Sequence, residues 1–137
     1  MSLRLLSRTL SVVGARNVAL FHTTRAALTG KVHVATNETF DDLVLKAKEP
    51  VIVDFHADWC GPCRVLGPAL AKEVEANKKV TMVKLDTDEA ADLAMKYKVT
   101  ALPTVIAFHK GEPVDKFVGA QGVKFVREFV EKHAQRA

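Results

Sequence analysis

The sequence predicts an α/β fold, in which a mixed β-sheet is flanked by helices on both faces. Over residues 31–97, short segments that are apolar, or that alternate apolar and polar residues, are separated by segments of helical periodicity. This order favours parallel strands in one sheet. Two further apolar segments then follow each other across the turn 110–113, which is typical of an antiparallel hairpin. The expected sheet is therefore parallel at first and ends in an antiparallel C-terminal hairpin.

The strands of this sheet are short segments rich in β-branched or alternating apolar residues. We expect them at residues 31–35, 51–57, 80–85, 104–108 and 114–118. The β-branched apolar run at 51–57 is typical of a buried strand.

The helices are expected at residues 38–48, 60–77 and 88–97 and after Gly122. Thr36 or Asn37 can cap the first helix, and Pro50 ends it. The second helix begins at Cys60 and contains Pro68, which is expected to kink it. The last helix is amphipathic, with an apolar face formed by Val123, Val126, Phe129 and Val130.

The chain has 137 residues, which suits one domain, and its charge is unevenly distributed. Residues 1–30 contain four arginines and no acidic residue, whereas residues 31–137 contain 16 basic and 16 acidic side chains. The net charge of +4 therefore belongs to the N-terminal segment, and it is poor evidence for binding nucleic acid. We expect a targeting segment at 1–30 and a single folded domain at 31–137.

The composition of residues 1–30, rich in Arg, Ser and Thr, is typical of a mitochondrial transit peptide. Cleavage is expected at about 24–30, near Arg25-Ala26-Ala27, which would place the mature protein in the mitochondrial matrix. The longest uncharged stretch of the segment, 17–24, is too short to span a membrane. The stretch 9–15 is barely long enough for the core of a secretory signal, and a basic tail without targeting function stays open as an alternative.

The chain contains two cysteines, Cys60 and Cys63, in one C-x-x-C pair. A disulfide across so short a loop restrains the unfolded chain little, so chemistry explains the pair better than stabilisation. The pair lies where a buried strand ends and a helix begins, and a helix N-terminus stabilises a thiolate. We expect Cys60 to be the more exposed nucleophile and Cys63, one turn further in, to resolve the mixed disulfide.

A zinc site is not expected, because one C-x-x-C supplies two of about four ligands. The histidines are scattered along the chain, and His56 alone lies near the cysteines. An inert pair would leave Gly61-Pro62 between the cysteines unexplained. No G-x-G-x-x-G or phosphate-binding loop is present, so no bound cofactor is expected.

Residues 53–64, with the sequence Val-Asp-Phe-His-Ala-Asp-Trp-Cys-Gly-Pro-Cys-Arg, resemble the thioredoxin family. The resemblance extends over residues 31–137, and together with the N-terminal segment it resembles the mitochondrial form. It implies a thioredoxin fold and reduction of protein disulfides. Gly61-Pro62 is the pair typical of thioredoxins, whereas disulfide isomerases, glutaredoxins and DsbA-like oxidants usually carry other residues there.

The resemblance also implies a substrate-binding surface. Leu102-Pro103-Thr104 resembles the cis-proline element of the family, which packs beside the disulfide and pairs with an extended substrate segment. Trp59 is expected to cover the disulfide, and Gly119 matches a site of close approach. The substrate-binding residues implied in this way are Trp59, Gly61, Pro62, Leu102, Pro103 and Gly119.

Asp54 is a lone carboxylate in an apolar strand, which suggests a buried group with a raised pKa. The resemblance implies that Asp54 handles the proton of Cys63, through water, with Lys84 as its charge partner. The alternative is an aspartate at a strand end that faces solvent. His56 departs from the family, since many thioredoxins have tryptophan there, and we interpret it as a packing variant rather than a catalytic base.

Three functions are compatible with these observations. The first is a monomeric electron carrier that thioredoxin reductase re-reduces and that supplies peroxiredoxin and other oxidised proteins. The second is a binding module whose redox state is only a switch. The third is an oxidase or isomerase, against which the intact Gly61-Pro62 and the N-terminal segment both argue. We expect no nucleic-acid or membrane partner.

Overall fold

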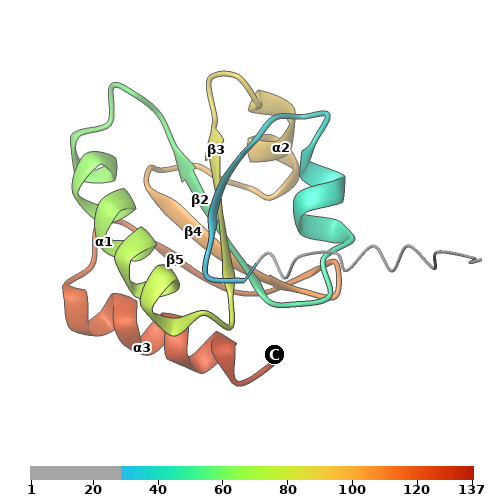
Figure 1. Cartoon of the computed structure of the whole chain (residues 1–137). Helices are drawn as coiled ribbons and strands as arrows, with labels where there is room; N and C mark the ends of the chain where they lie inside the picture. Colours follow the sequence, from blue (N-terminus) through green and yellow to red (C-terminus); the bar gives the residue numbers. More distant parts are fainter. Residues whose placement is uncertain (1–28) are drawn as a thin grey trace, which may run out of the picture.

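The computed structural model describes residues 29–137, so the predicted targeting segment lies almost entirely outside the described residues. These residues form a five-stranded sheet with the order β1-β3-β2-β4-β5 (Figure 1). β3 pairs in parallel with β1 and β2, whereas β4 is antiparallel to both β2 and β5. The predicted mixed sheet with a C-terminal hairpin is therefore confirmed. The strands are β1 (Val32–Ala35), β2 (Val51–His56), β3 (Thr81–Asp86), β4 (Thr104–His109) and β5 (Glu112–Val118).

Helices cover both faces of the sheet, as the sequence predicts. They are the π-helix η1 (Asp41–Leu45) and the α-helices α1 (Gly61–Asn77), α2 (Ala91–Lys96) and α3 (Val123–Ala134). Figure 1 shows α1 and α3 side by side on one face, while η1 and α2 lie on the other. α1 continues as one helix through Pro68.

Two helices are shorter than predicted, because side-chain and non-α hydrogen bonds take over their ends. The first is a π-helix in which the Lys46 N–H donates to the Asp41 carbonyl, at 2.9 Å. Before α2, the Asp86 carboxylate accepts the N–H of Asp88 at 2.8 Å, and this turn occupies residues predicted to be helical.

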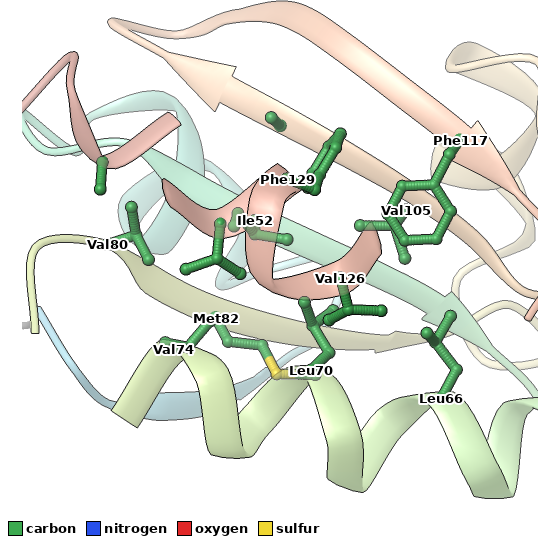
Figure 2. Close-up of a cluster of buried hydrophobic side chains, with 13 residues drawn as sticks. Ile52, Leu66, Leu70, Val74, Val80, Met82, Val105, Phe117, Val126 and Phe129 are labelled. Carbon is green, nitrogen blue, oxygen red and sulfur yellow. The ribbon is translucent and has the colours of Figure 1, made fainter. Parts of the chain in front are cut away.

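The core on the α1 and α3 face consists of aliphatic and phenylalanine side chains from both helices and the central strands (Figure 2). Leu66 and Leu70 of α1 and Val126 and Phe129 of α3 are buried there, which explains why these two helices pack together. Val123, predicted to share that apolar face, is instead 56% exposed, because it is the first residue of α3 and lies beyond the packed part of the helix.

The opposite face has a core of aliphatic side chains with a cluster of aromatic rings, and η1 and α2 pack against it. The Tyr97 and Phe108 rings are 5.1 Å apart between centroids and meet edge to face, and Phe40 packs against both. With two separate cores holding its faces, the central strand β2 is buried on both sides, as predicted. Within residues 29–137, no helix has the length and apolar composition that crossing a membrane requires.

Candidate active site

The end of β2 leads directly into the cysteine pair at the start of α1. Cys60 is the N-cap of α1, and its Sγ accepts the backbone N–H of Cys63 at 3.3 Å. The two cysteines form a disulfide, and their Cα atoms are 5.3 Å apart. Pro62 lies in the first turn, where a backbone N–H is not needed for the helix. The predicted placement of the pair at a helix N-terminus is therefore confirmed.

The expectation that Cys60 is the more exposed cysteine is wrong for the disulfide form. Cys60 is 4% exposed and Cys63 is 6% exposed. Both pack with Ala57 and with the half-buried Leu102. Helix position alone therefore does not make Cys60 the more exposed residue of the disulfide.

The Leu102–Pro103 peptide bond is cis, as the family resemblance implies. The backbone N–H of Gly119 donates to the carbonyl of Pro103 at 2.8 Å, which joins the end of β5 to this loop. Gly119 has φ +88°, a conformation that favours glycine, and a Cβ atom there would meet no other atom within 4 Å. Leu102, which packs against the disulfide, Pro103 and Gly119 therefore form a continuous surface beside the disulfide, which we call the ledge.

Trp59 lies on the surface next to the disulfide and is 70% exposed. Its indole N–H donates to the Asp88 carboxylate, in the connection between β3 and α2, at 3.0 Å. Gly61 and Pro62 are exposed as well. The contact with Asp88 could not be predicted from the sequence, because nothing in the local pattern links two residues 29 positions apart.

Asp54 is fully buried in β2. Neither of its carboxylate oxygens has a hydrogen-bond partner among residues 29–137. Burial raises its pKa to about 6, against the opposing influence of the Lys84 ammonium. The predicted buried carboxylate is confirmed, and the alternative of a solvent-facing aspartate is wrong.

A cavity of about 510 Å³ connects Asp54 to the redox pair. Asp54, Lys84 and Cys63 all line it. Gly67 of α1 lies above Asp54, and a Cβ atom at this position would approach the Asp54 Oδ2 to 3.5 Å. The absence of a side chain at Gly67 therefore keeps room around the carboxylate. Lys84 of β3 is paired with Asp54 in the parallel ladder of β2 and β3. Within the described part of the chain Lys84 makes no hydrogen bond to Asp54, so it acts on the carboxylate only through its charge.

His56 lies two residues after Asp54 in β2, so its side chain is on the same face of the sheet. Its side chain is half-buried and lines the same cavity. Burial, followed by the charge of Lys84, lowers the pKa of the imidazole. His56 is thus part of the cavity wall, between Asp54 and the loop that leads to Cys60.

The thioredoxin family model matches residues 31–132. The chain belongs to the thioredoxin family. It is 47% identical to the mitochondrial thioredoxin of Mus musculus over 112 residues, covering 81% of this chain and 67% of that protein. It is 45% identical to the mitochondrial thioredoxin of Bos taurus over 112 residues, with 81% and 67% covered.

Solved thioredoxin structures have the same fold. A mutant thioredoxin from Halobacterium salinarum superposes with a TM-score of 0.70 at 32% identity, covering 77% of this chain and 93% of that one. Thioredoxin from Malassezia sympodialis superposes with a TM-score of 0.69 at 32% identity, covering 75% and 90%. The chain is therefore a protein-disulfide reductase of the thioredoxin family, with Cys60 and Cys63 as its redox pair, and it is mitochondrial like its mammalian relatives.

Proposed function

We propose that this thioredoxin works in the mitochondrial matrix, after removal of residues 1–30, as the electron donor to oxidised matrix proteins. Thioredoxin reductase returns the disulfide to the dithiol with electrons from NADPH, and peroxiredoxin is among the oxidised partners. The observation that carries this proposal is the Cys60–Cys63 disulfide at the N-terminus of α1, beside the cis-Pro103 loop.

The reaction transfers two electrons through a mixed disulfide. The Cys60 thiolate attacks one sulfur of the substrate disulfide, forming a Cys60–substrate bond and releasing the other substrate sulfur as a thiolate. The Cys63 thiolate then attacks the Cys60 Sγ, which restores the Cys60–Cys63 disulfide and releases the second substrate thiolate. The helix N-terminus and the Cys63 N–H favour the thiolate of Cys60.

Asp54 is proposed to accept the proton of the Cys63 thiol before the second attack, through water. Three features support this role: the carboxylate is buried, it has no hydrogen-bond partner within residues 29–137, and it shares a cavity with Cys63. Lys84, opposite Asp54 on β3, is proposed to stabilise the charge that Asp54 then carries.

The ledge beside the disulfide is proposed to bind an extended segment of the substrate. Leu102 offers its backbone, the buried Pro103 anchors the loop, and the space around Gly119 leaves room for the substrate. On the other side of the disulfide, Trp59, Gly61 and Pro62 are exposed and supply an apolar contact. Together these residues would place the substrate disulfide in line with Cys60.

The test is insulin disulfide reduction by the full chain with NADPH and thioredoxin reductase. We expect steady NADPH consumption by the native protein and none by Cys60→Ser. A native protein without turnover would contradict the reductase proposal and would favour a binding module or an oxidant.

A Cys63→Ser variant separates the roles of the two cysteines. It retains the nucleophile and lacks the resolving thiol, so it should accumulate mixed disulfides that Cys60→Ser cannot form. Non-reducing mass spectrometry after incubation with oxidised peroxiredoxin would detect them. Trapping of mixed disulfides by Cys60→Ser instead would reverse the assignment of the two cysteines.

Sedimentation of the native protein alone tests the separate expectation that it is a monomer.

A further inference from the structure

A histidine and two aspartates meet at the carboxyl ends of β2 and β3, next to the redox pair but not part of it. His56 and Asp86 are registered neighbours on these two parallel strands, two residues beyond Asp54 and Lys84. Asp58 follows in the loop before Cys60. One ligand atom from each of His56, Asp58 and Asp86 lies within 4.8 Å of the other two. Strand register therefore brings Asp86 to His56, and the loop after β2 adds Asp58 as a third potential metal ligand.

The cavity that His56 and Asp58 line with Asp54 has room for a polar occupant. Both carboxylate oxygens of Asp54 are buried without a hydrogen-bond partner among the described residues. A buried carboxylate without a donor is costly, so a water molecule or a hydrated cation in this cavity would satisfy it.

The charges around the imidazole also favour a cation. Lys84 is the strongest single charge that acts on His56, but the three carboxylates of Asp86, Asp58 and Glu89 outnumber it. Arg64 is close as well, but its guanidinium donates to the backbone carbonyl of Asp58, at 2.8 Å, which leaves the Asp58 carboxylate available. The Oδ1 atom of Asp86 accepts from the N–H of Asp88, and Oδ2 remains for an ion.

We propose that His56, Asp58 and Asp86 bind a divalent transition-metal ion, for which zinc is the best match. One imidazole nitrogen with two carboxylate oxygens suits Zn²⁺, whereas Mg²⁺ and Ca²⁺ prefer oxygen ligands alone. Zinc needs ligand atoms at ~2.0–2.2 Å, and the exposed Asp58 side chain can rotate to close the site. Water completes the coordination, and neither cysteine takes part.

The disulfide form of the full chain provides the sharpest test, because its cysteines cannot ligate zinc. Titration calorimetry with zinc chloride should show one ion bound per chain. His56→Asn and Asp58→Asn should each weaken binding at least about tenfold. Asp58 lies in an exposed loop, so its substitution leaves the fold intact. The matched control is His109→Asn, which replaces a half-buried histidine outside the cluster and should bind zinc as the native protein does.

A spectroscopic measurement locates the ion. Cobalt(II) added to the oxidised protein should broaden the ring signals of His56 and leave those of His109 sharp. No zinc binding at millimolar concentration, or equal binding by the native, His56→Asn and Asp58→Asn proteins, would overturn the proposal. Broadening at His109 alone would do the same.

Discussion

Asp54 and Asp115 are two carboxylates on the same face of one sheet, and the structure treats them in opposite ways. Asp54 is paired with Val105 of β4, and Asp115 with Ala107, so both side chains point toward α1 and α3. Asp54 has no hydrogen-bond partner among the described residues, and burial raises its pKa.

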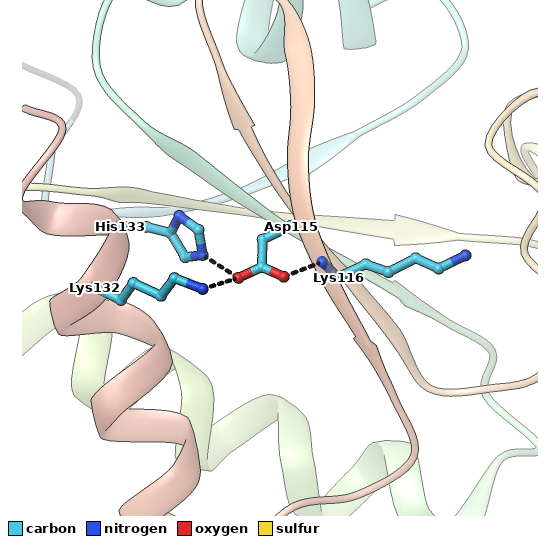
Figure 3. Close-up of polar contacts among 4 residues, drawn as sticks. All are labelled: Asp115, Lys116, Lys132 and His133. Atoms are coloured by element: carbon cyan, nitrogen blue, oxygen red, sulfur yellow. Dashed lines mark hydrogen bonds and ion pairs between the residues drawn. The ribbon is translucent and has the colours of Figure 1, made fainter.

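Asp115 lies instead at the centre of a network (Figure 3). Its Oδ2 contacts the Lys132 ammonium at 2.8 Å and the His133 ring nitrogen at 3.0 Å, and its Oδ1 accepts the N–H of Lys116. These hydrogen bonds, that of Lys132 first, lower the pKa of Asp115.

The comparison teaches that burial and hydrogen-bond partners together decide what a carboxylate does. Asp115 joins the edge strand β5 to the last turn of α3, and its charge is stabilised by donors. Asp54 keeps its proton to a higher pH because only Lys84 opposes its desolvation, which suits a group that exchanges protons. Asp115 stabilises the fold, whereas the buried Asp54 lowers the stability of the fold and is available for proton transfer.

The largest expected effect is that of Asp54→Asn. Burial raises the pKa of Asp54 to about 6 in the folded state, compared with 3.8 in the unfolded chain. The stability of the native protein therefore falls as pH rises between these two values. Relative to the native protein, the variant should therefore gain about 3 kcal/mol between about pH 4 and pH 8. Urea unfolding measures this gain in buffer with EDTA, which keeps the proposed zinc site empty.

The same variant should lose insulin-reducing activity, by about tenfold to a hundredfold, if Asp54 takes the Cys63 proton. A stability gain that does not change with pH, or full activity at neutral pH, would contradict the contrast drawn with Asp115.

A smaller effect is expected from Asp115→Ala. The change leaves the buried Nε2 of His133 without a partner, which should cost about 1–3 kcal/mol at neutral pH. Because the folded pKa of Asp115 is lowered, its contribution is present above about pH 4 and is lost as pH falls through the folded value, opposite to Asp54. Urea unfolding should show this loss, with insulin reduction unchanged. A large loss of activity would show that the network also supports the active site.

His133→Leu tests the contribution of His133 to the pH dependence of stability, and the Asp54→Asn background removes the contribution of Asp54. Burial lowers the pKa of His133, although its bond to Asp115 opposes the shift. The unfolded chain therefore binds the proton first, and stability is lost as pH falls through the unfolded value of 6.5. Removing the imidazole should reduce the slope of the stability profile between about pH 5 and pH 7, and the slope that remains is that of His56, whose pKa is also lowered. An unchanged slope would show that His133 does not contribute to it.

The smallest effect is expected from Arg127→Ala. Arg127 of α3 forms two bonds to the Glu73 carboxylate of α1, at 3.1 and 3.3 Å, and the Arg127 side chain is exposed to solvent although that of Glu73 is largely buried. Solvent screens such pairs, so the loss of stability should be smaller than that of Asp115→Ala and should shrink further at high salt. An equal loss for the two variants would mean that burial of His133 adds nothing to the Asp115 network.

Much of the fold and of the site could be predicted from the sequence. The order of the strands and helices, the cysteine pair at a helix N-terminus and the burial of Asp54 all follow from local periodicity and spacing. These signals are local, because each depends on neighbours within a few positions of the chain.

Only the tertiary structure decided how the distant residues meet. It buried Cys60 as deeply as Cys63 and exposed Val123. It also placed His56 beside Asp86 and brought Lys132 to Asp115. Strand register and helix packing determine these contacts, and both depend on the whole chain closing around two cores.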